Sequence, residues 1–112
     1  MIELEKLKKM IKIFISQPMK DKTNQEIEQE RKKIIEKIRK HFEKIKIEVI
    51  DSFFKDAPHD AKPLWFLGKS LELLSNANVI VLGKGWERSR GCRIEHECAV
   101  QYGIPIIYIE NL

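Results

Sequence analysis

The stretch NVIVLGKGWERSRGCRIEHECAVQYGIPIIYI, from Asn78 to Ile109, decides the fold predicted for this chain. It contains two short apolar runs, 78–83 and 104–109, separated by a glycine-bounded loop and an amphipathic segment, 92–102. Apolar runs without strict alternation are typical of strands that are covered on both faces. A strand, a helix and a second strand in this order predict parallel pairing through a right-handed crossover. Gly103 is expected to end the helix, because glycine readily adopts the left-handed conformation found there.

The same alternation of apolar runs and helical segments continues toward the N-terminus. IKIFIS (11–16) and KIEVID (46–51) are predicted as strands, with helices from Thr23 to about residue 44 and from Pro63 to about residue 75. TNQE fits a capping box, in which Thr23 and Glu26 exchange hydrogen bonds between side chain and backbone. The positions expected to face inward on these two helices are Ile27, Ile34, Ile35, Ile38 and Phe42, and Leu64, Leu67, Leu71 and Leu74.

These elements predict an α/β fold, a small doubly wound parallel sheet of the Rossmann-like or flavodoxin-like kind. Its four strands are expected in the order 2-1-3-4, flanked by helices. We expect a single domain over residues 11–112, preceded by an N-terminal arm or short helix over residues 1–10. Ligands of such sheets bind outside the carboxyl ends of the strands. The loops after Ser16, Asp51 and Gly83 are expected to form that edge.

The composition and charge of the chain indicate which class of protein it belongs to. The 112 residues are 43% hydrophobic and 34% charged, which is typical of one soluble domain. No apolar run approaches the roughly 18 residues of a membrane span, so no membrane contact is expected. The two cysteines, Cys92 and Cys98, fall in one predicted helix, which argues against a disulfide framework and favours a cytoplasmic location. The net charge is +4, but the lysines of the first half alternate with glutamates, a pattern of solvated helices rather than of nucleic-acid binding.

Neither a metal nor a cofactor is predicted. Cys92, His96 and Cys98 lie close in sequence, but no second pair of ligands accompanies them elsewhere in the chain. The chain also lacks a glycine-rich dinucleotide motif and a P-loop.

The loop 83–91 is the first candidate binding element. Its glycines permit positive φ and a close approach of backbone to ligand, and the N–H groups at the following helix start favour an anion. Three arginines would offset the charge of that anion; the competing interpretation is that they are solvated and pair with nearby glutamates. The arginines are Arg88, Arg90 and Arg93, and the glutamates are Glu87 and Glu97. The ligand-binding positions expected here are Gly85, Trp86, Arg90, Gly91 and Cys92.

The SQPM segment is the second candidate. Ser16, Gln17, Pro18 and Met19 follow the strand expected at the centre of the sheet. A hydroxyl, an amide and free backbone N–H groups suit a phosphate or a ribose. The competing interpretation is an ordinary strand-to-helix turn that Pro18 holds in place.

Several aromatic residues are expected near the same edge. Trp86 lies between a glycine and a glutamate in a loop, so we expect it to be exposed and to stack on a base or to pack in an interface. Phe53, Phe54 and Trp65 could stack on a base, but such residues more often cover a core or join subunits. We expect self-association into a homodimer or a larger oligomer.

Glu95 is the candidate for chemistry. On a helix it shares a face with Cys92, Ala99 and Tyr102, and this face is expected to pack on the sheet. We expect the helix N-terminus and the nearby arginines to keep its carboxylate ionised. An ionised, positioned carboxylate can attack a sugar C1 or stabilise an oxocarbenium-like transition state. The competing interpretation is a glutamate that only complements the helix dipole.

Arg31 interrupts the apolar stripe of the first helix, between Ile27 and Ile34. A buried arginine needs a partner. It is expected to pair with a core carboxylate such as Asp51, to snorkel to the edge, or to contact the ligand.

The C-terminal half, together with KIFISQPM and RKKIIEKI, resembles the nucleoside 2-deoxyribosyltransferase-like superfamily over about residues 11–109. Members have a helix ending in Leu-x-x-Ala-Asp, a strand, a loop, then Gly-x-x-x-Glu-x-x-x-Ala and a closing strand. The matching positions here are Leu74, Ala77 and Asn78, then Gly91, Glu95 and Ala99. The closest branch is one of small proteins, often from phages, with Ser-Gln-Pro-Met near the start.

This resemblance implies a function. Glu95 falls on the nucleophilic glutamate of the superfamily, and the loop after the first strand falls on its phosphate- or sugar-contacting loop. Active members usually carry acids where Ser70 and Ser89 stand here, so the usual proton donor to the leaving base is missing. Candidate substitutes are Asp51, Asp56, His59 and Glu87.

Three functions therefore remain open. The first is a nucleotide- or deoxynucleoside-binding N-glycosidase or 2-deoxyribosyltransferase with Glu95 as nucleophile. The second is a nucleotide-binding or sequestering protein without turnover. The third is an oligomeric nucleic-acid-associated protein.

Overall fold

The computed structural model describes residues 10–112. The arm expected over residues 1–10 therefore lies, apart from Met10, outside the described part of the chain. The elements, in chain order, are β1 (Ile11–Ser16), α2 (Asn24–His41), β2 (Ile47–Val49), α3 (Pro63–Leu74), β3 (Val79–Leu82), η1 (Trp86–Arg88), α4 (Arg90–Gln101), β4 (Ile106–Tyr108) and η2 (Ile109–Asn111).

The four strands form one parallel sheet in the order β2-β1-β3-β4. The predicted α/β class, parallel pairing and strand order are thus confirmed. Ile13 of β1 lies opposite both Val49 of β2 and Val79 of β3, and Ile80 of β3 lies opposite Ile106 of β4. Because all four strands run the same way, their carboxyl ends meet at one edge of the sheet.

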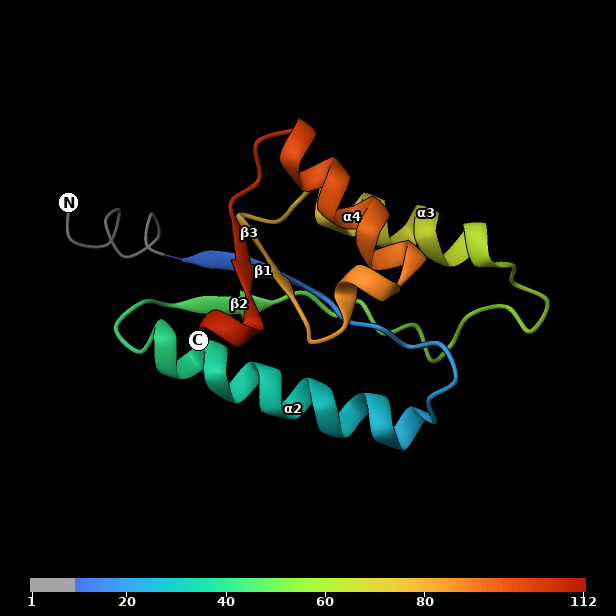
Figure 1. Cartoon of the computed structure of the whole chain (residues 1–112), viewed down its shortest axis with the longest axis horizontal. Coiled ribbons are helices and arrows are strands. Elements are labelled where there is room, and N and C mark those ends of the chain that lie inside the picture. The colour runs from blue at the N-terminus through green and yellow to red at the C-terminus, as the bar shows by residue number, and fades with distance from the viewer. Residues whose placement is uncertain (1–9) are drawn as a thin grey trace.

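The sheet lies between two layers of helix, with α2 on one face and α3 and α4 together on the other (Figure 1). Successive side chains of a strand point to opposite faces, so β1 contributes to two cores. Ile13 and Ile15 pack with Ile34 and Ile38 of α2, and Phe14 packs on the opposite face. That second core contains Leu74 of α3, Ile80 and Leu82 of β3, and Ala99 of α4.

Local signals explain where the helices begin and end. Thr23 caps α2 in a capping box with Glu26, as predicted. The helix stops at His41, about three residues earlier than expected, and Phe42 is its C-cap. α4 begins at Arg90 rather than at Cys92, because the Ser89 side chain accepts a hydrogen bond from the backbone N–H of Cys92 and so acts as N-cap.

Most of the positions expected to face inward are buried or pack against a core, but Leu67 of α3 is only half-buried and belongs to neither core, and two positions at helix ends are exposed. Ile27, Ile34 and Ile38 are buried, and the other expected positions of α2 pack against the core. Leu64, in the first turn of α3, is instead 78% exposed. Tyr102 is 83% exposed, because it is the C-cap of α4 and no longer shares the helical face of Ala99. Gly103 has a positive φ of 71°, as its C′ position requires.

No helix within residues 10–112 is long and apolar enough to cross a membrane.

Candidate active site at the carboxyl edge of the sheet

The centre of the site is a contact between Glu95 and Ser16. Ser16 is the last residue of β1, and its hydroxyl donates a hydrogen bond of 2.6 Å to Oε1 of Glu95. Glu95 is 7% exposed and Ser16 1% exposed. The inward face of α4 comprises Cys92, Glu95 and Ala99, so packing of this face on the sheet directs the carboxyl group toward the strand ends. The face of the helix that bears Glu95 packs on the sheet as expected, and the structure adds the direct contact with Ser16.

The pKa of Glu95 shifts in the direction opposite to the one expected from a helix N-terminus and nearby arginines. Burial raises the pKa of its carboxyl group, and the hydroxyls of Ser16 and Ser70 only partly oppose this effect. The arginines, which were expected to favour the ionised form, are not among the groups that set this pKa. Glu95 is the sixth residue of α4, whereas the dipole acts mainly over the first turn. The loop arginines are exposed, so solvent screens their charge.

Ser70 and Cys92 complete the surroundings of the carboxyl group. Ser70 lies in α3 and supplies a second hydroxyl that favours the ionised form of Glu95. Cys92 lies one turn earlier in α4, and burial raises the pKa of its thiol, while Ser16 and Ser89 act in the opposite direction. Three elements, β1, α3 and α4, thus bring two hydroxyls and a thiol to one buried carboxyl group.

The loops after β1 and β3 touch directly above these strands. The backbone N–H of Gly83 donates to the carbonyl of Ser16 at 2.8 Å. A Cβ at Gly83 would lie 3.4 Å from Cβ of Gln17 and 3.5 Å from a methyl group of Ile34, which is ordinary van der Waals contact and shows how closely the two loops approach. Gly85 has φ of +83°, and a Cβ there would lie 3.8 Å from Pro18. Of the expected binding residues, Gly85 and Pro18 are therefore neighbours.

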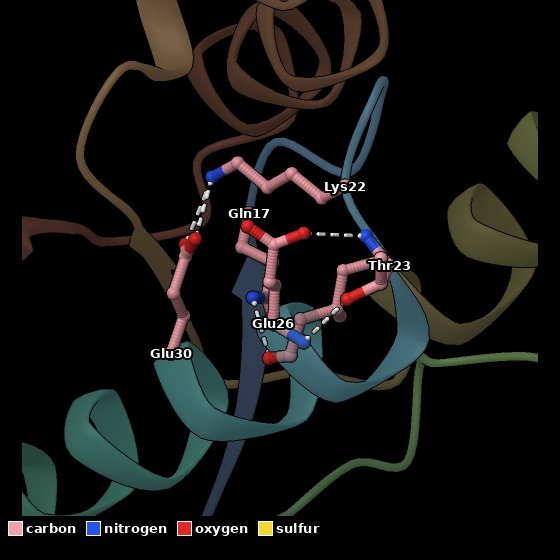
Figure 2. A network of polar contacts seen from close by, with 6 residues as sticks. Gln17, Lys22, Thr23, Glu26 and Glu30 are labelled. Atoms are coloured by element: carbon pink, nitrogen blue, oxygen red, sulfur yellow. Dashed lines mark hydrogen bonds and ion pairs between the residues drawn. The ribbon is translucent and has the colours of Figure 1, made fainter.

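Gln17 is held by the protein itself. It is 5% exposed, and its Nε2 donates to the carbonyl of Ile27 (Figure 2). Its Oε1 accepts from Arg31. Both ends of the amide are thus occupied, which favours a structural role over ligand contact.

The rest of the loop between β1 and α2 is tied to the helix by an ion pair. Lys22 Nζ lies 2.7 Å from Oε1 and 3.0 Å from Oε2 of Glu30, and Figure 2 shows the lysine reaching across from the loop. The backbone N–H of Lys22 also donates to the carbonyl of Met19. Met19 and Pro18 are half-buried.

Arg31 is buried and makes three hydrogen bonds, to Gln17, to the carbonyl of Ile50 and to the hydroxyl of Ser52. The expected ion pair with Asp51 does not form, because Asp51 is exposed and acts on Arg31 only through its longer-range charge. Ser52 was not among the residues predicted for this site. Its position directly after a predicted strand that faces an arginine-bearing helix was the available signal.

Trp86 was expected to be exposed, but it is half-buried. Its ring stacks on His96, with centroids 4.4 Å apart, and lies 5.7 Å from the ring of Tyr108. His96 in turn bonds to the hydroxyl of Tyr108 at 3.0 Å. One face of the indole ring is therefore covered by His96. Trp86 is not a fully exposed side chain on which a base could stack from either face. Trp86 and Tyr108 line a shallow pocket of about 220 Å³ beyond β3 and β4.

The loop arginines divide into two kinds. Arg93 donates to the carbonyl of Glu87 at 2.9 Å, so its partner is the backbone rather than the carboxylate expected in the competing interpretation. Arg90 is the first residue of α4 and is exposed, as is Arg88. Gly91 and Cys92 follow in the first turn, and Cys92 is buried. Arg90 is thus free to approach a ligand at the helix N-terminus, whereas Cys92 faces Glu95.

Two further expectations concern the β2 side and metal binding. Phe54 packs edge-on against Trp65, with ring centroids 5.9 Å apart, and both rings adjoin Phe66. Phe53 is half-buried beside Lys55.

Over residues 10–112, no three histidine, cysteine, aspartate or glutamate side chains are grouped so that they could hold a metal ion.

Comparison with known proteins places the chain in a family. No curated protein and no solved structure matches it. Residues 11–108 match a protein family, and this range runs from the first residue of β1 to the last residue of β4, so that it includes Ser16, Ser70 and Glu95. Because the match spans the whole sheet and its candidate site, the chain belongs to the family described as Domain of unknown function (DUF4406).

Proposed function

We propose that this protein binds a nucleotide or deoxynucleoside at the carboxyl edge of its sheet and cleaves or transfers the N-glycosidic bond. Glu95 is the nucleophile. The observation that carries the proposal is the buried Glu95 carboxyl group, hydrogen-bonded by Ser16 where the loops after β1 and β3 meet. The resemblance of this region to nucleoside 2-deoxyribosyltransferase-like proteins supports the choice of substrate class.

The proposed chemistry has two steps. An oxygen of ionised Glu95 forms a bond to C1′ of the sugar while the bond from C1′ to the base nitrogen breaks, and the base leaves with the electron pair and takes up a proton. Water, or a second base, then attacks C1′ and releases Glu95. Burial raises the pKa of Glu95, so its carboxylate is more basic than one in water and correspondingly more nucleophilic. Ser16 fixes the orientation of that carboxylate.

A second candidate function is nucleotide binding without turnover. The groups that act on Glu95 are the hydroxyls of Ser16 and Ser70, and the thiol of Cys92 lies within reach of its charge. Within the described part of the chain, no second carboxyl group bonds to this cluster. A leaving base would then be protonated by water alone, which favours a protein that holds its ligand intact.

The test is release of free base from a panel of deoxynucleosides, ribonucleosides and their 5′-monophosphates. Glu95→Gln keeps the size and hydrogen bonding of the side chain but removes the charge, so base release is expected to fall by roughly three orders of magnitude or more. Glu97→Gln is the matched control, because Glu97 lies exposed on the same helix. Activity of the wild type is expected to rise with pH through the raised pKa of Glu95, since only the ionised form attacks.

The outcomes separate the two candidates. Base release that survives Glu95→Gln undiminished would refute the assigned mechanism. Ligand binding in calorimetry with no base release by the wild type would establish the second candidate. If no member of the panel binds, both candidates fall.

A further inference from the structure

Arg31 is a buried cation without a carboxylate partner. It is 9% exposed, lies in the second turn of α2, and forms no ion pair shorter than 4 Å with any acid of residues 10–112. Its three acceptors are neutral: Oε1 of Gln17 at 3.2 Å, the carbonyl of Ile50 at 2.8 Å and the hydroxyl of Ser52 at 3.1 Å. Placing a charge in such surroundings is costly. Stability alone is therefore a weak reason for an arginine here.

The three acceptors lie in two different loops. Gln17 follows β1, whereas Ile50 and Ser52 follow β2. Ser52 also donates to the carbonyl of Ile15, one residue before Ser16, at 3.3 Å. The guanidinium thus joins the carboxyl ends of two neighbouring strands, and its planar array of N–H groups can bond several acceptors in fixed directions.

Gln17 transmits this constraint toward Glu95. Its side chain is fixed at one end by Arg31 and at the other by the carbonyl of Ile27. Gly83 lies next to it, since a Cβ at Gly83 would be 3.4 Å from Cβ and 3.5 Å from Cα of Gln17. The adjoining residue, Ser16, donates to Glu95 at 2.6 Å. Residues on both sides of the Ser16 hydroxyl, Ile15 and Gln17, are therefore anchored through the arginine.

We propose that Arg31 is a positioning residue: it holds the loops after β1 and β2 so that the Ser16 hydroxyl points at the Glu95 carboxyl group. It acts on Glu95 through Gln17 and Ser16, without touching it. The importance of this role for catalysis rests on the proposed function, but the coupling itself does not, and it can be measured without turnover.

The experiment measures the pKa of Glu95 by ¹³C NMR of the labelled carboxyl group, assigned from the signal that Glu95→Gln removes. Ser16→Ala is expected to raise this pKa, lowering the acid dissociation constant about tenfold, because a hydrogen bond to the anion is lost. Arg31→Met is expected to raise it in the same direction. Arg39→Met is the matched control, since Arg39 is exposed on the same helix, and it should leave the pKa unchanged.

The double variant Ser16→Ala, Arg31→Met distinguishes positioning from simple charge. If Arg31 acts through Ser16, its effect disappears once the hydroxyl is gone, and the double variant matches Ser16→Ala. An effect of Arg31→Met that persists in full in the Ser16→Ala background is electrostatic and would overturn the proposal. An unchanged pKa in Arg31→Met would also overturn it. Cys92 does not obscure the titration, because burial raises its thiol pKa further above that of a carboxyl group.

Two measures keep the test decisive. If Arg31→Met does not fold, Gln17→Met removes the acceptor that links Arg31 to Ser16 while preserving the length of the side chain. It must then raise the pKa of Glu95, and an unchanged value counts against the proposal. Absence of base release in the wild type would sink the proposed enzyme but leave the NMR coupling intact, whereas lost coupling with base release present would sink only the positioning role.

Discussion

At the scale of the residue, the protein buries one carboxyl group, that of Glu95, in surroundings that disfavour its ionised form. Glu95 is 7% exposed, and burial outweighs the hydrogen bonds that favour its ionised form. The same feature makes the group reactive in the proposed mechanism and costs stability when it is ionised.

This conflict gives a prediction about pH and stability. Because folding raises the pKa of Glu95, the folded protein binds the proton of this carboxyl group more tightly than the unfolded chain does. Its contribution to stability is then full below the ordinary pKa of glutamate, about 4.3, and is lost as pH rises through the folded value. Glu95→Gln removes that loss, so its advantage in free energy of unfolding over the wild type should grow with pH across this window.

Urea unfolding at several pH values measures this difference. Glu97→Gln, at an exposed position of the same helix, should show no such growth. A Glu95→Gln difference that is flat or declines with increasing pH would mean that the carboxyl group is not destabilised when ionised.

At the scale of the element, α2 illustrates how a local signal fixes a helix end. Thr23 Oγ1 accepts from the N–H of Glu26 at 3.1 Å, and the N–H of Thr23 donates to Glu26 Oε1 at 2.9 Å (Figure 2). These bonds satisfy N–H groups that the helix leaves without partners. The start of α2 also positions Ile27, whose carbonyl accepts from Gln17.

We therefore predict that Thr23→Ala destabilises the protein by about 1 kcal/mol, the usual cost of losing an N-cap. Thr23→Ser retains the hydroxyl and should cost only a small fraction of this. In urea unfolding the alanine variant should shift the midpoint downward by roughly 0.5–1 M at an unchanged slope. Equal destabilisation by both substitutions would assign the effect to the lost methyl group rather than to the cap.

At the scale of the whole molecule, an apolar surface remains on the first turn of α3. Leu64 is 78% exposed and Phe66 37% exposed, and Phe66 packs against Trp65 and Phe54. Exposed large apolar side chains can mark contact sites. We propose that this surface joins two copies of the chain.

The prediction is a dimer at high micromolar concentration in light scattering or sedimentation. Leu64→Lys should weaken association about tenfold or more, since burying a leucine side chain is worth about 1.5–3 kcal/mol. Val100→Lys is the control, because Val100 is also exposed, at 52%, but lies on α4. A monomeric wild type, or equal weakening by both substitutions, would exclude this surface as the interface.

The sequence by itself determined the architecture. Apolar runs, glycine and serine or threonine caps, and the alternation of strand and helix predicted the parallel sheet and its order, because these signals act over a few residues and agree with one another. They also predicted that Ser16 ends the central strand and that the helical face bearing Glu95 packs on the sheet, since strand ends and the inward face of a helix are set by periodicity; the hydrogen bond between the two side chains was not predicted. The helix ends were less predictable: Leu64 and Tyr102 carry apolar side chains at helical spacing but extend past the surface that α3 and α4 cover.

Only the tertiary structure decided the environment of the site. The charge state of Glu95 depends on how completely other elements exclude water from it, and the sequence pattern gave no measure of that burial. A carboxylate such as Asp51 was one of the partners expected for Arg31, yet Asp51 is exposed, and the carbonyl of Ile50 and the hydroxyl of Ser52 accept from Arg31 instead. One face of the Trp86 ring packs on His96 instead of facing solvent, because α4 brings the His96 ring within stacking distance. Residues far apart in sequence make each of these contacts, and side-chain spacing along the chain carries no information about them.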